Sequence, residues 1–127
     1  MRLLLDTSVL IDVLRARKDR RRLLAHLLRE GHTLTTSVLS IAELYAGMRA
    51  GEEIPTEAFL VGLEYVELHE SAAKLAGKLK REWQSRGKTL TLSDTIIAAI
   101  AIESGSTLLT DDRRDFPMPE VSLYSLP

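Results

Sequence analysis

Short apolar runs alternate with longer stretches of helical periodicity along the chain, and this alternation predicts strands separated by helices. Residues 2–5 are an apolar run that predicts a buried strand, and a helical stretch follows from about Ser8 to Arg15. The stretch from about Asp19 to Glu30 predicts a second helix, with Gly31 just past its end. The apolar stripe of that helix consists of Leu23, Leu24, Leu27 and Leu28.

The remaining elements continue this alternation to the end of the sequence. In chain order they are a Thr-rich strand at 32–37, a helix that opens at Ser37 or Ser40 and fades near Gly51, a helix at about 56–65 with Pro55 in its first turn, a short strand at 66–69, an amphipathic helix at 70–86 ended by Gly87, an apolar helix from Ser93 to Gly105, and strands at 106–110 and 121–124. The helix from Ser93 is apolar almost all round, so we expect it to be buried.

Strands separated by helices are typical of an α/β fold with a mostly parallel sheet. A chain of 127 residues, of which 45% are hydrophobic, has the size of a single domain with one core. Parallel sheets bind their ligands at the carboxyl ends of the strands. The residues that directly follow each strand are therefore the first candidates for a functional site.

Neither a membrane-spanning segment nor a signal peptide is predicted. No apolar run approaches the length that crosses a bilayer, and Arg2 leads straight into a strand with no small-residue cleavage site after it. Cys is absent, which excludes disulfides and thiolate metal sites. These features fit a reducing compartment, so we expect a cytoplasmic protein with no membrane association.

The net charge of −1 conceals two basic segments. Residues 15–29 hold seven Lys and Arg with one Asp, and residues 74–88 hold six Lys and Arg with one Glu. The rest of the chain is therefore acidic, a pattern that suits a protein holding a polyanion near carboxylates. Two solvated helix faces explain the same runs, and charge alone favours this second interpretation.

Four acidic residues, far apart in the sequence, share a relation to the predicted strands. Asp6 comes just after the first strand, and Asp112 comes just after the strand at 106–110. Glu43 lies in the helix that follows the second strand, and Asp94 lies at the start of the apolar helix that leads into the strand at 106–110. The α/β interpretation places all four acids near one end of the sheet.

Two of these acids also suit a purely structural role at a helix start. Asp6 is a favourable N-cap for the helix near Ser8, where its carboxylate accepts backbone N–H bonds. Asp94 follows Thr91 at a spacing that fits a capping pattern, and acids in a first turn are favoured by the helix dipole. Taken alone, each fits a site residue and a helix cap equally well.

Structural roles also explain the other two acids when each is taken alone. Glu43 completes a capping box if its helix begins at Ser40, but not if the helix begins at Ser37. Asp112 lies among acids and arginines in the stretch 111–115, and Asp-rich surface turns are common. The capping and turn interpretations explain each acid separately, and they predict no common meeting place.

The four acids together predict a cation site. Clustered carboxylates repel one another and raise each other's pKa unless a cation lies among them. There is no Cys, and none of the three His lies near these motifs, so the ligands would be hard oxygens. Such ligands suit Mg²⁺ or Mn²⁺ and argue against zinc.

Three segments of the chain resemble the PIN domain family: LLLDTSVLID at 3–12, SIAELYAGM at 40–48 and LSDTIIAAIAIESGSTLLTDDRRDF at 92–116. Within this family the chain is most similar to the VapC-type ribonuclease toxins of prokaryotic toxin–antitoxin systems. The resemblance covers 1–127 as one PIN domain, although 51–87 matches in length and pattern more than in identity. It implies a small, mostly parallel sheet flanked by helices on both sides, with acids gathered around one or two divalent ions.

Carried over by position, the resemblance implies the catalytic and metal-binding residues for Mg²⁺ or Mn²⁺. They are Asp6, Glu43, Asp94 and Asp112. Thr7 or Ser8 helps to hold the first carboxylate or its water, and Thr110 supplies the hydroxyl that precedes the fourth acid. The fourth position is often Asn in related toxins, and the full charge of Asp112 favours metal binding here.

The loop around Asp112 holds further candidates. Asp115 is expected to support the site, and another loop register brings in Asp111 or Asp115 instead. Arg113 and Arg114 lie nearest the acids in the sequence and are the candidates for RNA binding. The two basic segments are candidate rims, because an acid cluster repels RNA unless Lys and Arg contact its phosphates.

The resemblance implies a Mg²⁺-dependent endoribonuclease, the toxin of a VapBC-type pair, that hydrolyses RNA phosphodiester bonds at a four-carboxylate site. It also implies a homodimer and a cognate VapB-like antitoxin, whose tail enters the acidic groove beside Leu44, Met48 and the helix at 56–65. The main alternative is a catalytically inactive PIN module that binds RNA or a protein partner. A DNA nuclease and a receiver-like phosphoacceptor fit less well, because neither a substrate clamp nor a partnered Lys is evident.

Overall fold

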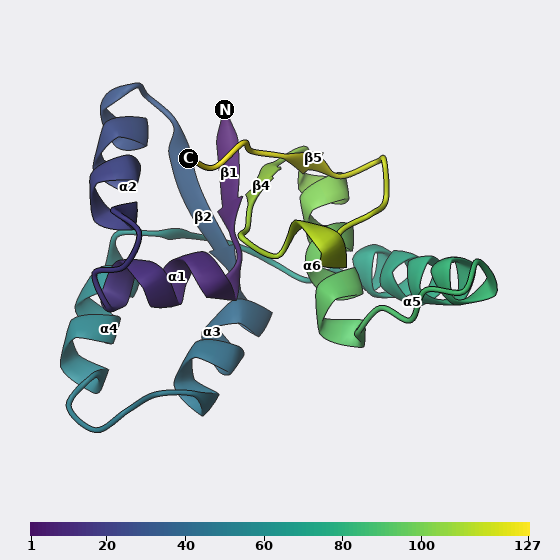
Figure 1. Cartoon of the computed structure of the whole chain (residues 1–127), viewed down its shortest axis with the longest axis horizontal. Helices are drawn as coiled ribbons and strands as arrows, with labels where there is room; N and C mark the ends of the chain where they lie inside the picture. Colours follow the sequence, from purple (N-terminus) through teal and green to yellow (C-terminus); the bar gives the residue numbers. More distant parts are fainter.

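Strand β1 (Arg2–Leu5) lies at the centre of a five-stranded sheet in the computed structural model, which describes residues 1–127 (Figure 1). The strand order is β3-β2-β1-β4-β5, and every neighbouring pair is parallel. The other strands are β2 (Thr33–Ser37), β3 (Glu64–Val66), β4 (Thr107–Leu109) and β5 (Ser122–Leu123). The predicted α/β fold is confirmed, and its sheet is wholly parallel.

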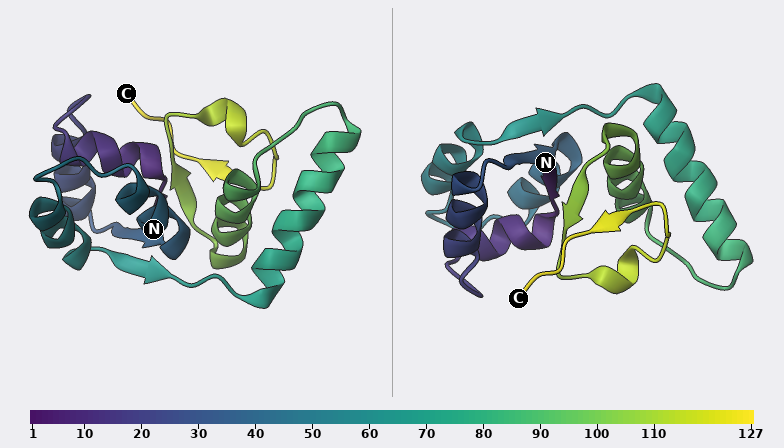
Figure 2. Two further views of the ribbon diagram at one scale, coloured as in Figure 1. Left: turned by 90° about the horizontal axis from the view of Figure 1, so that it is seen from below. Right: turned by 90° about the horizontal axis from the view of Figure 1, so that it is seen from above.

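Helices cover both faces of this sheet. They are α1 (Thr7–Leu14), α2 (Arg20–Arg29), α3 (Val38–Ala46), α4 (Glu53–Val61), α5 (Glu70–Ser85), α6 (Leu92–Ser104) and the short 3₁₀ helix η1 (Arg113–Asp115). Figure 2 shows α5 and α6 on one side of β1 and the first four helices on the other. The alternation of side chains along β1 explains this division, because Leu3 and Leu5 pack with the first group and Leu4 with α5 and α6. None of these helices has both the length and the apolar character that a bilayer span requires.

The strand order changes direction at β1. The chain passes from β1 to β2 and β3 on one side, and it later places β4 and β5 on the other. The crevice beyond the carboxyl ends of β1 and β4 is therefore the place where a parallel sheet binds ligands. The backbone N–H of Asp6 donates to the carbonyl of Leu109 at 3.0 Å, which holds these two strand ends together.

Helix α3 begins directly at the end of β2. Ser37 is its N-cap, because the Ser37 Oγ accepts a hydrogen bond from the Ser40 N–H at 3.1 Å. Glu43 consequently lies in the second turn, where it cannot close a capping box. That structural interpretation of Glu43 is wrong. The helix also ends at Ala46, before the predicted end near Gly51.

The segment from α4 to β3 departs furthest from the predicted boundaries. Helix α4 begins at Glu53 rather than near Thr56, and Pro55 still lies in its first turn, where a missing N–H is tolerated. Strand β3 spans Glu64–Val66 instead of 66–69. It is an edge strand with largely exposed side chains. Its hydrophobic pattern is therefore weak, and the predicted strand lay too far toward the C-terminus.

Candidate active site

Asp6 is the most deeply buried of the four predicted acids. It is the N-cap of α1, and only 5% of its surface is exposed. Its Oδ1 accepts a hydrogen bond from the Thr7 N–H at 2.9 Å, and its Oδ2 accepts one from the Thr110 hydroxyl at 2.7 Å. The capping interpretation is therefore correct for one carboxylate oxygen, while the other oxygen joins β1 to the segment after β4.

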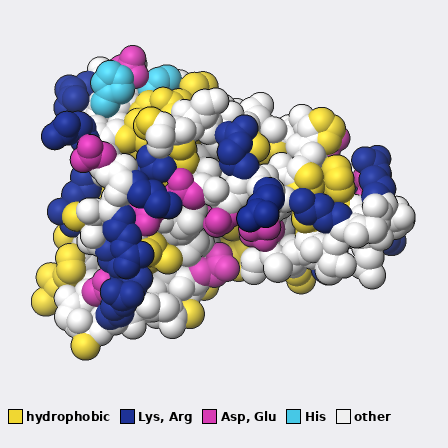
Figure 3. Space-filling view, in the orientation of Figure 1, with side chains coloured by type: hydrophobic (Ala, Val, Ile, Leu, Met, Phe, Trp, Pro, Cys, Tyr) yellow, Lys and Arg dark blue, Asp and Glu magenta, His cyan; other side chains and the backbone are white.

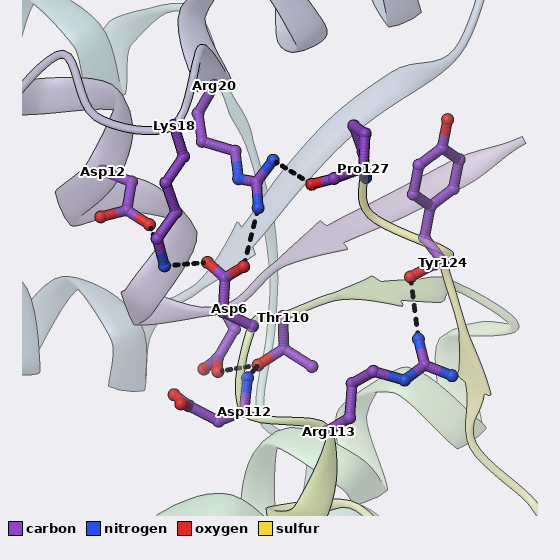
Figure 4. A network of polar contacts seen from close by, with 10 residues as sticks. Asp6, Asp12, Lys18, Arg20, Thr110, Asp112, Arg113, Tyr124 and Pro127 are labelled. Carbon is purple, nitrogen blue, oxygen red and sulfur yellow. Dashed lines mark hydrogen bonds and ion pairs between the residues drawn. The ribbon is translucent and has the colours of Figure 1, made fainter.

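The segment after β4 folds around the Thr110 hydroxyl. This hydroxyl donates to Asp6 and accepts a hydrogen bond from the Asp112 N–H at 3.0 Å (Figure 4). Helix η1 begins one residue later, at Arg113. A single hydroxyl thus ties the backbone of Asp112 to the carboxylate of Asp6.

Glu43 enters the same region from α3 through a contact with Thr7. The Thr7 hydroxyl donates to the Glu43 Oε1 at 2.8 Å, and the Thr7 N–H donates to Asp6. One residue therefore contacts two of the predicted acids. The neighbouring Ser8 has a buried Oγ with no hydrogen-bond partner, so this hydroxyl is available to a water or a ligand.

Asp94 lies in the first turn of α6. Thr91 is the N-cap of this helix, and its Oγ1 accepts a hydrogen bond from the Asp94 N–H at 3.1 Å. The helix begins at Leu92, one residue before the predicted start. Burial raises the pKa of Asp94, the hydrogen bond with Thr91 opposes this, and three nearby negative charges raise it further. Those charges belong to Asp115, Glu43 and Asp112.

The carboxylate of Asp6 is shifted in the same direction. Burial raises its pKa to about 6, although the hydrogen bonds from Thr110 and Thr7 lower it in part. The charges of Asp94 and Asp112 add to the increase. The fold therefore brings the four acids within electrostatic reach of one another, and their repulsion favours either a bound cation or protons.

The donor set fits a hard divalent cation. As the side chains stand, no three acidic groups are close enough together to enclose an ion. Mg²⁺, however, keeps several waters and commonly takes only one or two carboxylates together with substrate oxygens. The repelling carboxylates of Asp6 and Asp94 and the unpartnered hydroxyl of Ser8 suit that kind of open site.

Asp111 is held outside this group by two cations. Arg20 Nη2 lies 2.7 Å and Lys18 Nζ lies 3.5 Å from its carboxylate, and Lys18 is also 3.4 Å from Asp12 (Figure 4). Burial raises the pKa of Asp111, but the hydrogen bond and charge of Arg20 outweigh this and hold it below its ordinary value. The alternative loop register that would bring Asp111 among the metal ligands is not the one that the structure adopts.

Four cations of the basic segment at 15–22 make contacts within the protein, although only Arg20 is buried. Arg15 bonds to Glu52 at 3.1 Å, Lys18 and Arg20 pair with Asp111, and Arg21 donates to the carbonyls of Val13 and Leu14. The buried Arg20 is therefore excluded from an RNA-binding rim, and for the other three cations that role stays a prediction. Arg17 and Arg22 remain exposed. Neither Asp12 nor Arg20 was predicted to be buried. The position of Asp12 on the apolar side of its helix was nevertheless a signal in the sequence for a buried acid.

Basic side chains flank the acids on one face of the molecule. Figure 3 shows an acidic group in the middle of this face with Lys and Arg on both sides. Arg113 donates to the carbonyl of Tyr124 at 3.2 Å, whereas the Arg114 side chain has neither an ion pair nor a hydrogen bond. Lys88 donates to the carbonyl of Arg114, which places the loop after α5 beside η1. Of the two predicted RNA-binding arginines, Arg114 is the one without an internal contact.

The chain has relatives that span most of its length. It matches the PIN domain family over residues 3–120. It is 36% identical over 115 residues to ribonuclease VapC19 of Mycobacterium tuberculosis, across 91% of this chain and 92% of that protein. It is 33% identical over 118 residues to ribonuclease VapC10 of the same organism, across 93% of this chain and 88% of that protein.

Solved structures share the fold. VapBC2 from Rickettsia felis, bound to a DNA fragment from its promoter, superposes with a TM-score of 0.89 at 22% identity and covers 100% of both chains. VapBC-1 from nontypeable Haemophilus influenzae superposes with a TM-score of 0.81 at 19% identity, over 98% of this chain and 97% of that one. With a family match across nearly the whole sequence and relatives above 30% identity, the chain belongs to the PIN domain family and, within it, is related to the VapC proteins.

Proposed function

We propose that this protein is a Mg²⁺-dependent endoribonuclease and the toxin of a VapBC-type pair. The observation that carries the proposal is the pair of acids Asp6, just after β1, and Asp94, in the first turn of α6, whose pKa values are both raised by burial and by the charges of neighbouring acids. The relatives with more than 30% identity over most of the chain are named ribonucleases, which supports the same activity. Mn²⁺ suits the same ligands and is the alternative ion.

Asp6 and Asp94 are the proposed principal ligands of the cation, and Glu43 and Asp112 complete the cluster directly or through water. When bound, the cation lowers the pKa of a coordinated water and offsets charge on the scissile phosphate. The protein's own contribution is to orient these carboxylates. Thr110 fixes Asp6 from one side, and Thr7 fixes both Asp6 and Glu43 from the other.

Two other polar residues have supporting roles in this proposal. The unpartnered Ser8 hydroxyl holds a water near the first carboxylate. Asp115, whose charge acts on Asp94, adds to the negative potential that attracts the cation.

The substrate is proposed to enter across the basic side chains around η1. An RNA phosphate approaching the acids meets repulsion, which positive side chains at the rim offset. Arg114 is the stronger candidate for a phosphate contact, since Arg113 already donates to Tyr124. The few aromatic residues leave base stacking a minor part of recognition.

A VapB-like antitoxin is the proposed protein partner. Three of the solved relatives are VapBC complexes, and another is described as a toxin–antitoxin complex from Klebsiella pneumoniae. Leu44, Met48 and Thr56 line one hollow between α1, α3 and α4, but its volume of about 10 Å³ is too small for a peptide tail, so an antitoxin tail would have to lie across the surface around it. A homodimer is also expected, as in related toxins.

The proposal is tested by RNA cleavage in the presence and absence of Mg²⁺. Asp6→Asn and Asp94→Asn should each abolish metal-dependent cleavage. Asp19→Asn is the matched control, because this exposed acid makes no capping hydrogen bond and its left-handed backbone (φ 56°) suits Asn. Undiminished cleavage by the first two variants would refute the assignment. Calorimetry with Mg²⁺ on the wild-type and Asp6→Asn proteins distinguishes an active enzyme, which binds the ion through Asp6, from an inactive module that binds none.

A further inference from the structure

We propose that Arg20 is a positioning residue for the active site and acts through Asp111. This inference rests on the proposed function, because it assigns a residue to the same site. Arg20 does not touch the four acids. It holds the segment 110–112, which contacts Asp6. Three observations support the assignment: the burial of Arg20, its ion pair with Asp111, and the backbone conformation of the turn before α2.

Arg20 is a buried cation at an unfavourable place. Only 3% of its surface is exposed, and it is the first residue of α2, where the helix dipole disfavours positive charge. Its Nε has no hydrogen-bond partner. Burying a guanidinium is costly unless a well-aligned anion compensates it. The 2.7 Å contact from Arg20 Nη2 to Asp111 Oδ1 supplies this compensation.

The turn before α2, which positions Arg20, contains residues in strained backbone conformations. Ala16, Lys18 and Asp19 all have left-handed backbone conformations, with φ values of 52°, 53° and 56°. Such residues raise the free energy of the fold, and they persist only where the surrounding contacts require them. The turn brings both Lys18 and Arg20 to Asp111, at 3.5 Å and 2.7 Å from its carboxylate.

Asp111 stands between the two residues that organise the site. Thr110, before it, donates to Asp6, and Asp112, after it, donates its N–H back to Thr110. Holding the Asp111 side chain in place therefore also holds its two neighbours, Thr110 and Asp112. Loss of the Arg20 contact would free this segment, so that the Asp6 carboxylate and the Asp112 side chain would lose their relative orientation.

The test compares Arg20→Met and Asp111→Asn with Arg21→Met. Arg21 is the matched control, because it is the next residue of α2 and also ties that helix to a neighbouring segment, through the carbonyls of Val13 and Leu14. Outer contacts that orient metal ligands typically contribute 10–100-fold to metal affinity or activity. We expect about a 10-fold or greater loss of Mn²⁺ affinity by calorimetry in the two test variants, with lower kcat and unchanged KM for RNA.

The control should keep both quantities within about twofold of the wild-type values. Arg20→Lys, which retains the charge, should recover part of the loss if Arg20→Met folds poorly. The inference is overturned if folded Asp111→Asn or Arg20→Met loses stability yet keeps Mn²⁺ affinity and kcat.

Amide hydrogen exchange at Asp112 separates this inference from the proposed function. Its N–H is bonded to Thr110, and the exchange rate is measured in the metal-free protein without any RNA. Faster exchange in Asp111→Asn, with no change in Arg21→Met, supports positioning even if the wild-type protein proves inactive. An unchanged exchange rate contradicts it. Wild-type protein that binds Mn²⁺ but does not cleave RNA refutes the proposed function alone.

Discussion

The hydroxyl of Thr110 donates a 2.7 Å hydrogen bond to the Oδ2 of Asp6, joining residues 104 positions apart in the sequence. The bond connects the carboxyl ends of β1 and β4, where the strand order changes direction. It is fully buried, and it lowers the pKa of an acid that burial raises. The Asp6 carboxylate is therefore held in one orientation before any ligand arrives.

Replacing Thr110 by Val should remove this orientation while preserving side-chain shape. Asp6 loses a donor and Asp112 loses an acceptor, so we expect Mg²⁺ affinity to fall by about 10-fold or more. Loss of a buried hydrogen bond to a carboxylate should also lower the unfolding free energy by about 2 kcal/mol. Mg²⁺ titration and urea unfolding measure the two effects.

Thr110→Ser is the control for that experiment. It keeps the hydroxyl and removes only a methyl group, so metal affinity should stay close to the wild-type value. Equal losses in the Ser and Val variants would show that packing around Thr110, which is 1% exposed, matters rather than its hydrogen bonds.

Asp6→Asn should stabilise the metal-free protein above pH 6. Because burial raises the Asp6 pKa from 3.8 to about 6, the folded protein binds this proton more tightly than the unfolded chain. The resulting stabilisation is present below pH 3.8 and is lost as the pH rises to 6, an effect of about 3 kcal/mol. Asn carries no charge, so the variant escapes this loss.

Urea unfolding of both proteins between pH 4 and pH 8 measures this difference. The two stabilities should be similar near pH 4, should diverge as the pH rises, and should converge again when Mg²⁺ is added to the wild-type protein. A constant difference across this range would mean that Asp6 is not desolvated in the folded state.

Mg²⁺ binding should release protons near pH 6. At this pH about half of the metal-free molecules carry a proton on Asp6, since its pKa is about 6, and the ion displaces this proton. Metal affinity should therefore weaken as the pH falls below 6. Calorimetry in two buffers of different ionisation enthalpy reports the release directly. Identical heats in both buffers at pH 6 would contradict it.

Local sequence pattern was sufficient to predict the framework of this site. The apolar run of β1 followed by Asp6, and the apolar helix α6 with Asp94 in its first turn, are determined by burial and by caps that neighbouring residues supply. The parallel sheet then dictates that residues after β1 and β4 meet. The influence of Asp94 and Asp112 on the Asp6 pKa agrees with this expectation. A common metal site formed by all four acids stays a prediction.

Pairings between distant side chains could not be predicted in the same way. Charge runs favour solvation on average, and nothing near residue 20 in the sequence reveals that Arg20 is buried beside Asp111. The outcome depends on the strained turn before α2, which only tertiary contacts maintain. The edge strand β3 was misplaced for a related reason, since its exposed side chains carry little hydrophobic pattern.

Arg114→Ala should weaken RNA binding in a salt-dependent manner. The Arg114 side chain has no internal ion pair, so its removal should cost no folding energy beyond a few tenths of a kcal/mol, as for surface substitutions in general. Each phosphate contact on a single strand contributes about 0.7 to the slope of log affinity against log salt concentration. The variant should therefore show a slope smaller by about 0.7, a higher KM and an unchanged kcat.

Arg29→Ala is the matched control for Arg114→Ala, because the exposed Arg29 ends α2 just before β2 begins, near the amino ends of the strands, whereas the acids follow their carboxyl ends. RNA binding by fluorescence anisotropy across a range of salt concentrations compares the two variants, with the Asp6→Asn background used to prevent cleavage. Equal slopes for Arg114→Ala and Arg29→Ala would place the phosphate contacts elsewhere on the surface. The exposed Arg17 and Arg22 would then be the next candidates, since they are the cations of segment 15–22 that the fold leaves without internal partners.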